Sequence, residues 1–195
     1  MIVLASQSPR RQELLIQAGL PFVVRVAGIA EVRGADEPPE HYVQRLAREK
    51  AAAVPSLLDE YVLAADTTVV VDGAVLEKPE SAEDAARMLR ALSGREHVVL
   101  TGVCLRYRGR EWLGVEQTIV RFAPLTAAEI LDYASTGEPM DKAGAYAIQG
   151  LASKFITAID GCYFNVVGLP IARVYGLLKE AGYYNSALGA AADAR

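Results

Sequence analysis

The segment from Tyr61 to Val71 constrains the fold of this chain most, because it is one long apolar and β-branched run. Such a run predicts a buried strand, and the Asp72-Gly73 pair that follows it is typical of a tight hairpin turn. A single acid, Asp66, interrupts the run. A buried carboxylate is costly unless it is paired, hydrogen-bonded or bound to a metal, so we interpret Asp66 as a functional residue.

A second constraint lies at the N-terminus, where the apolar run Ile2 to Ala5 leads into Ser6-Gln7-Ser8-Pro9-Arg10-Arg11. This order predicts a strand followed by a helix, with Ser8 as N-cap, Pro9 in the first turn and Gly19 at the end. A helix N-terminus offers free amide groups and the positive end of the helix dipole. The positive charges of Arg10 and Arg11 are unfavourable there unless an anion neutralises them. We therefore predict a bound anion such as phosphate. The alternative is an ordinary surface helix with solvated arginines.

The rest of the chain alternates helical and strand patterns. A helix is predicted between Pro39 and Pro55, with Lys50 on its apolar stripe. There the ammonium either reaches the edge of the core or is directed at a ligand. Strands are predicted on both sides of Arg108-Gly109, and a further hairpin at Asp160-Gly161 with its second strand at residues 163–167.

These elements predict one α/β domain over residues 1–185, with a mixed, strongly twisted sheet that contains antiparallel hairpins and is flanked by helices. Residues 186–195 are rich in alanine and are expected to form a flexible tail.

Composition excludes several classes of function. A formal net charge of -4 at pH 7 argues against nucleic acid as the main partner, because such proteins usually carry a basic face. No apolar stretch approaches the ~18 residues of a membrane span, and no signal peptide is recognised, so a cytoplasmic protein without a membrane partner is expected. Cys104 and Cys162 lack metal-ligand spacing and are expected to be reduced thiols.

The remaining polar residues suit phosphoryl chemistry. Cations neutralise phosphate oxygens in the transition state, while carboxylates hold a divalent metal or orient an attacking water. A Gly-rich P-loop is absent from the sequence, and Asp66-Thr67-Thr68 lacks the second aspartate of an aspartyl-phosphate-forming phosphatase, so water is the expected nucleophile. The cations are Arg10, Arg11, Lys50, Lys78 and Lys142, and the acids are Glu31, Asp66 and Asp141.

Eight motifs follow one another along the chain from residue 2 to about residue 180: Ser6-x-Ser8-Pro9-Arg10-Arg11, Arg45-Leu46-Ala47-Arg48-Glu49-Lys50-Ala51, Ala65-Asp66-Thr67, Glu77-Lys78-Pro79, Leu92-Ser93-Gly94, Thr101-Gly102-Val103, Asp141-Lys142-Ala143-Gly144-x-Tyr146 and Asn165-Val166-Val167-Gly168-Leu169-Pro170. With these motifs the chain resembles the Maf family of nucleoside triphosphate pyrophosphatases. The resemblance implies a fold related to the inosine-triphosphate pyrophosphatases, with a cleft between two lobes, and a homodimer. It also implies hydrolysis of a nucleotide to its monophosphate and pyrophosphate with a divalent metal, Mg²⁺ or Mn²⁺.

The resemblance also implies roles for single residues. The position that matches Asp66 is the general base, and those that match Arg11, Thr67 and Gln149 are associated with the choice of base. Arg, Thr and Gln at these positions are similar to the branch that acts on dTTP and UTP. The further expected site residues are Lys50 and Lys78 for catalysis, Ser8, Arg10 and Lys142 for substrate binding, and Glu31 with Asp66 for the metal.

Two other functions stay open at this point. A nucleotide-binding regulator of cell division would sense a triphosphate without turnover, and it would not need an acid such as Asp66 in a strand that faces the phosphates. A structural module with a surface anion site would show no dependence on metal. For the enzyme, the expected role is removal of unwanted or modified pyrimidine nucleotides.

Overall fold

The computed structural model describes residues 1–184, so the tail predicted at residues 186–195 lies outside the described residues. The strands are β1 Ile2–Leu4, β2 Phe22–Val24, β3 Tyr61–Val71, β4 Ala74–Leu76, β5 Glu96–Tyr107, β6 Arg110–Phe122 and β7 Ile156–Asp160. The α-helices are α1 Pro9–Gln17, α2 Pro39–Ala53, α3 Ala82–Leu92, α4 Ala127–Ser135, α5 Tyr163–Val167 and α6 Ile171–Glu180. Three short 3-10 helices are η1 Glu138–Asp141, η2 Ala143–Ala145 and η3 Leu151–Phe155.

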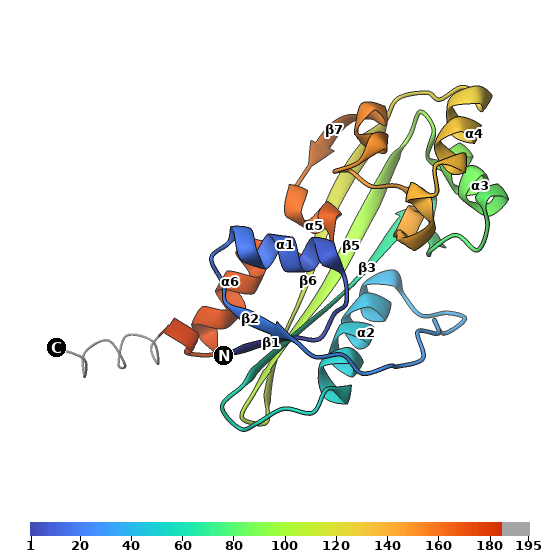
Figure 1. Ribbon diagram of the computed structural model, residues 1–195. Coiled ribbons are helices and arrows are strands. Elements are labelled where there is room, and N and C mark those ends of the chain that lie inside the picture. The colour runs from blue at the N-terminus through green and yellow to red at the C-terminus, as the bar shows by residue number, and fades with distance from the viewer. Residues whose placement is uncertain (185–195) are drawn as a thin grey trace.

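Within residues 1–184 the strands form one seven-stranded sheet in the order β2-β1-β3-β5-β6-β7, with β4 paired to β3. β1 runs parallel to β2 and β3, while the other pairs are antiparallel. The prediction of a mixed sheet with antiparallel hairpins and flanking helices is confirmed. Figure 1 shows β3, β5 and β6 as long strands that connect the two ends of the molecule.

Two of the predicted hairpin turns are present: Asp72-Gly73 joins β3 to the short strand β4, and Arg108-Gly109 joins β5 to β6. Asp72 and Gly73 have φ of 49° and 78°, and Arg108 and Gly109 have φ of 47° and 75°. Two successive residues with positive φ form the turn that matches the twist of paired strands, and glycine adopts this conformation without steric cost. In the separate pairing of β3 with β5, Asp66 lies opposite Gly102.

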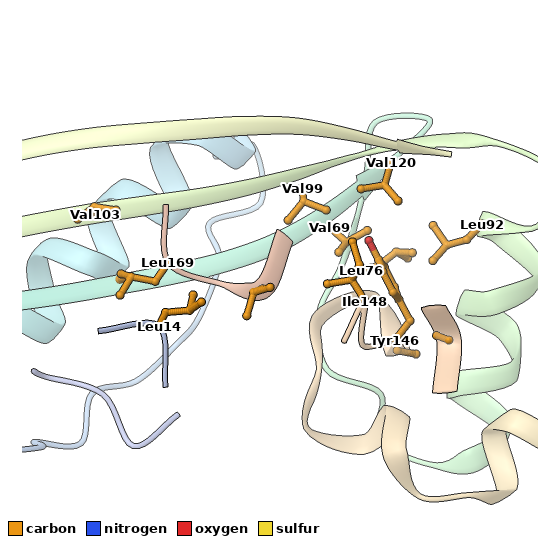
Figure 2. Packing of buried hydrophobic residues seen from close by; sticks show 14 of the residues in the cluster. Leu14, Val69, Leu76, Leu92, Val99, Val103, Val120, Tyr146, Ile148 and Leu169 are labelled. Atoms are coloured by element: carbon orange, nitrogen blue, oxygen red, sulfur yellow. The ribbon is translucent and has the colours of Figure 1, made fainter. Parts of the chain in front are cut away.

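Helices cover both faces of the sheet. The buried side of α2 packs on one face through small residues such as Ala47 and Ala51, which belong to the same buried cluster as Ala64 of β3. On the other face the larger buried cluster has two ends: one around Leu14, Val103 and Leu169, and one around Val69, Leu92, Tyr146 and Ile148, as Figure 2 shows. None of the helices in residues 1–184 is long and apolar enough to cross a membrane.

The prediction of a strand at residues 163–167 is wrong, because this segment is the helix α5. Its residues favour a strand, but Asn165 is fully buried and donates from Nδ2 to the carbonyl of Val99 and to Thr118 Oγ1, both at 3.0 Å. Gly168 ends the helix with φ of 121°. Tertiary hydrogen bonds that satisfy a buried amide therefore outweigh the local strand propensity.

One edge of β3 is left open between two short neighbours. β1 pairs with β3 only as far as Leu63, and β4 pairs with β3 only from Val69 onward, where its last residue, Leu76, lies opposite. Residues 64–68 thus have no strand partner on this edge within the described chain. Because side chains alternate across a strand, Asp66 and Thr67 point to opposite faces, and the open edge makes both reachable from one pocket.

Candidate active site

A pocket of about 840 Å³ lies at the open edge of β3. Its walls come from the first turn of α1, the loop after β2, α2, β3, the segment after β4, and the loops that follow η1 and η2. All the site residues expected from the sequence line this pocket, together with Asp141. These residues are Ser8, Arg10, Arg11, Glu31, Lys50, Asp66, Thr67, Lys78, Lys142 and Gln149.

The centre of the pocket holds two carboxylates around one ammonium group. Lys50 Nζ lies 2.5 Å from Asp66 Oδ1 and 2.9 Å from Glu31 Oε1. Lys50 can reach Asp66 because α2 crosses very close to β5: a Cβ on Gly102 would lie 2.3 Å from the carbonyl oxygen of Val43. Lys50 follows Val43 by two helical turns on the same face, so its side chain enters the pocket instead of extending to the core edge.

The two carboxylates have opposite pKa shifts. Burial raises the pKa of Asp66 above the ordinary carboxyl value, although the positive charge of Lys50 opposes this. Burial also acts on Glu31, but the hydrogen bond and charge of Lys50, with the charge of Lys78, outweigh it and lower the pKa of Glu31. A pair of carboxyl groups with separated pKa values suits a division of roles, with the group of raised pKa as general base.

Arg11 connects three segments that form the pocket wall. Its Nε donates to the carbonyl of Gly168 at 2.8 Å, and its Nη1 donates to Ser6 Oγ at 3.2 Å and to the carbonyl of Ala65 at 2.8 Å. Its Nη2 donates to Thr67 Oγ1 at 3.1 Å. Four of the five guanidinium N–H groups are thus used inside the protein, so Arg11 mainly fixes the position of Thr67 and leaves little for direct contact with a ligand.

The first turn of α1 differs in one detail from the prediction. Ser8 occupies the N-cap position, but its side chain makes no capping hydrogen bond. The Ser8 side chain therefore does not consume the amide groups of this turn, which favours the predicted anion site. Arg10 does not stay solvated, since its Nη1 contacts Asp141 Oδ2 at 3.1 Å. Asp141 also pairs with Lys142, so one carboxylate contacts both cations and a positive charge remains in excess.

Two predicted residues are free to meet a ligand. Lys78 and Gln149 are exposed in the pocket and form no hydrogen bond or ion pair with any residue between 1 and 184. A charged group and an amide at separate places in the wall match a ligand with an anionic part and a polar, uncharged part.

Sequence reasoning missed Tyr42, whose position at helical spacing on the α2 stripe indicated only a core residue. The Tyr42 hydroxyl donates to Glu77 Oε1 at 2.7 Å, and both side chains line the pocket. Burial and the contact with Glu77 raise the pKa of Tyr42, so its proton stays in this bond at neutral pH. A tyrosine on an otherwise apolar stripe is the only sequence signal for this contact.

A second missed group lies behind the pocket. Thr67 Oγ1 and Thr101 Oγ1 are 2.9 Å apart, and Thr101 Oγ1 donates to the carbonyl of Asn165 at 3.2 Å. With the bond from Arg11, these contacts form one directed chain from Arg11 through Thr67 and Thr101 to α5. The motif containing Thr101 was visible in the sequence, but its partner was not.

Comparison with known proteins gives consistent matches over nearly the whole chain. Residues 1–181 match the family described as "Maf-like protein". A relative from Koribacter versatilis, named dTTP/UTP pyrophosphatase, is 54% identical over 182 residues, with 93% of this chain and 94% of the relative covered. A relative of the same name from Anaeromyxobacter dehalogenans is 58% identical over 187 residues, with the same coverage.

Solved structures with some likeness are more distant. The Ham1 protein of Staphylococcus aureus is 14% identical with a TM-score of 0.45, over 63% of this chain and 71% of that one. A nucleoside-triphosphatase (dITP/XTP pyrophosphatase) from Mycobacterium abscessus is 17% identical with a TM-score of 0.39, over 64% of this chain and 74% of that one.

Proposed function

The chain belongs to the Maf-like protein family, and we propose that it hydrolyses dTTP and UTP to the monophosphate and pyrophosphate. The observation that carries this proposal is the arrangement of Asp66, Glu31 and Lys50 in a pocket whose other walls present further cations. The names of relatives more than 50% identical support the substrate class.

In this proposal the triphosphate lies over the first turn of α1. Arg10, Lys50 and Lys78 surround its oxygens, and Ser8 and Lys142 contact it from either side. Arg10 and Lys142 are paired with Asp141 in the protein alone. They would exchange this exposed carboxylate for phosphate oxygens, which accept stronger, charge-assisted hydrogen bonds. Asp66 accepts the proton of a water molecule that attacks the α-phosphorus, and pyrophosphate leaves.

The donor chemistry of the pocket fits a divalent cation, Mg²⁺ or Mn²⁺. Mg²⁺ commonly uses one or two carboxylates and completes its coordination with substrate phosphates and water. Asp66 and Glu31 both contact the same ammonium group and therefore point toward one region of the pocket. Within the described chain no group of three or more potential ligand side chains occurs, so we propose that these two residues hold the ion together with the nucleotide. The ion would supply neutralisation of phosphate charge.

We assign the choice of base to Gln149, with Thr67 and Arg11. The amide of Gln149 carries both a donor and an acceptor, which complement the O4 and N3–H edge of uracil or thymine. Cytosine presents a donor where uracil presents O4, and an acceptor at N3, so the proposed selectivity requires the amide of Gln149 to keep the orientation that suits uracil. Arg11 acts mainly through the position of Thr67, as its hydrogen bonds indicate.

Three wider aspects are part of the same proposal. We propose that the enzyme removes unwanted or modified pyrimidine nucleotides before they enter nucleic acid, and that it works in the cytoplasm, which agrees with two free cysteines. A homodimer is proposed from the family resemblance, and light scattering at several protein concentrations tests it.

The decisive experiment is a nucleotide panel with Mg²⁺, with products separated by anion-exchange chromatography. We expect UTP and dTTP to give monophosphate and pyrophosphate in equal amounts, at rates at least roughly tenfold above those of ATP, GTP and CTP. Release of orthophosphate with a diphosphate product would exclude attack at the α-phosphorus. Binding of nucleotide without any turnover would instead support the regulator hypothesis.

A further inference from the structure

The turn that carries Gln149 decides where its amide lies. Gln149 is exposed in the pocket, and within residues 1–184 its side chain has no hydrogen-bond partner of its own. The turn is closed by a hydrogen bond of 3.1 Å from the N–H of Gly150 to the carbonyl of Ala147. The backbone of this turn therefore fixes the origin of the Gln149 side chain and the part of the pocket that its amide can reach.

Both ends of the turn are held by one tyrosine and one glutamate. At its start, the N–H of Ala147 donates to Tyr133 Oη at 3.3 Å. Just after its end, the N–H of Leu151 donates to Glu138 Oε2 at 3.1 Å. The two side chains are also joined to each other, since Tyr133 Oη donates to Glu138 Oε1 at 2.8 Å. Tyr133 and Glu138 thus close one hydrogen-bonded ring around the turn.

The surroundings of this pair are tightly packed. A Cβ on Gly150 would lie 2.4 Å from both carboxylate oxygens of Glu138, so only glycine allows the carboxylate to sit this close to the turn. Tyr133 is buried, and its ring makes an edge contact with Phe155 at 5.6 Å. Burial raises the pKa of Tyr133, which keeps its hydroxyl proton available for Glu138 at neutral pH.

Tyr133 and Glu138 come from α4 and from the start of η1, and among residues 1–184 they are not part of the pocket lining. The groups assigned to the phosphates, Lys50 and Lys78, come from α2 and from the segment after β4. Lys142, also assigned to the phosphates, donates from Nζ to the backbone carbonyl of Glu138 at 2.6 Å, and a substitution of the Glu138 side chain keeps this carbonyl. A change at the side chains of the pair therefore acts on the turn with Gln149 and leaves Lys50 and Lys78 in place.

We propose that Tyr133 and Glu138 are positioning residues that determine base selectivity by holding the turn of Gln149. This inference rests on the proposed function, since it takes Gln149 as the residue that pairs with the base. Paired hydrogen bonds to a base edge require both atoms of an amide to be in place, so a small displacement of the turn removes the discrimination.

The test compares kcat and KM for UTP and CTP in the full-length protein and in Tyr133→Phe, Glu138→Ala, Glu138→Gln and Gln149→Ala. We expect Tyr133→Phe and Glu138→Ala to lower the UTP:CTP ratio of kcat/KM by about tenfold, close to the loss in Gln149→Ala. The loss should come from KM for UTP, with kcat for UTP within about twofold of the parent. Glu138→Gln should recover part of the ratio, because its amide oxygen still accepts from the N–H of Leu151.

Tyr175→Phe on α6 is the matched control, because it removes the same hydroxyl from a side chain outside the pocket lining of the described chain. It should keep the parental ratio. Rates for UTP and CTP that fall in parallel in Tyr133→Phe and in Glu138→Gln would overturn the inference, since they indicate general loss of structure. The two proposals fail separately: a parent without preference for UTP refutes the role of Gln149 itself. A parent that loses its preference only in Gln149→Ala refutes the roles of Tyr133 and Glu138 alone.

Discussion

The ammonium of Lys50 lies 2.5 Å from Oδ1 of Asp66, across the interface between α2 and β3. This ion pair offsets part of the desolvation penalty of placing Asp66 inside a strand, because a buried carboxylate is tolerated when an opposite charge pairs with it. The ammonium of Lys50 is shared, since it also pairs with Glu31. Two carboxylates therefore face one ammonium, which leaves room for a bound cation, while the other cations of the pocket can bind anions.

Substitution of Asp66 by Asn tests the proposed general base. The change keeps the shape of the side chain and removes its charge, so turnover of UTP should fall by at least ~10². The fold should be retained, because an amide in this place still hydrogen-bonds and avoids the cost of a buried charge. The measurement is a pyrophosphate assay with a melting curve on the same preparation. A variant that melts like the parent and retains its rate would remove Asp66 from the mechanism.

Substitution of Lys50 by Met tests how the charge of Lys50 affects the pKa of Asp66, measured through the dependence of activity on pH. Burial raises the pKa of Asp66, and Lys50 opposes this shift. A base must be deprotonated, so activity is lost as pH falls through its pKa. Without the positive charge the pKa of Asp66 rises further, and the acidic limb of kcat/KM for UTP should move to higher pH.

The residual activity of Lys50→Met is followed across the acidic range, with Lys179→Met on α6 as a control that should keep the parental profile. An acidic limb at the parental position in Lys50→Met would show that Asp66 is not the group that titrates.

Thr101 offers a paired test of the hydrogen-bond chain behind the pocket. Thr101→Val keeps the shape but leaves the carbonyl of Asn165 and the hydroxyl of Thr67 without this partner, whereas Thr101→Ser keeps the hydroxyl. Thr101 is fully buried, so the valine variant should lose about 1–3 kcal/mol in the free energy of unfolding. It should also lose selectivity for UTP over CTP, measured by kcat/KM, while the serine variant keeps most of it. If both variants have the same selectivity for UTP over CTP, the hydroxyl of Thr101 has no role in the choice of base.

His97 predicts how stability depends on pH. It is buried, its Nε2 lies 2.8 Å from Tyr146 Oη, and burial lowers its pKa from 6.5 to about 4. The unfolded chain therefore binds a proton at a higher pH than the folded one. Stability should fall as pH decreases from 6.5 to about 4, by about 3 kcal/mol in total for this one group.

Urea denaturation of the parent and of His97→Gln across this pH range provides the measurement. A neutral glutamine can replace the hydrogen bond to Tyr146 but does not titrate, so the variant should lose less stability on acidification. Parallel pH curves for the two proteins would contradict the assignment.

Local patterns predicted most of the secondary structure. The alternation and β-branched residues of Tyr61 to Val71, with the following Asp72-Gly73, determine a strand and turn through interactions between near neighbours in sequence. The same holds for the helix that begins at Pro39. The motifs also identified which residues line the pocket, because chemically unusual residues in apolar elements can be recognised without knowledge of the fold.

The tertiary structure decided which of these residues meet and what each is free to do. By residue type Arg11 and Lys78 are both cations suited to phosphate, yet Arg11 is bonded to backbone and Thr67 while Lys78 has no such partner in the described chain. The helix at Tyr163–Val167 and the ring of Tyr133 and Glu138 were likewise invisible. The physical reason is the same in each case: these contacts join segments distant in sequence, and their energies depend on burial and on partners that only packing brings together.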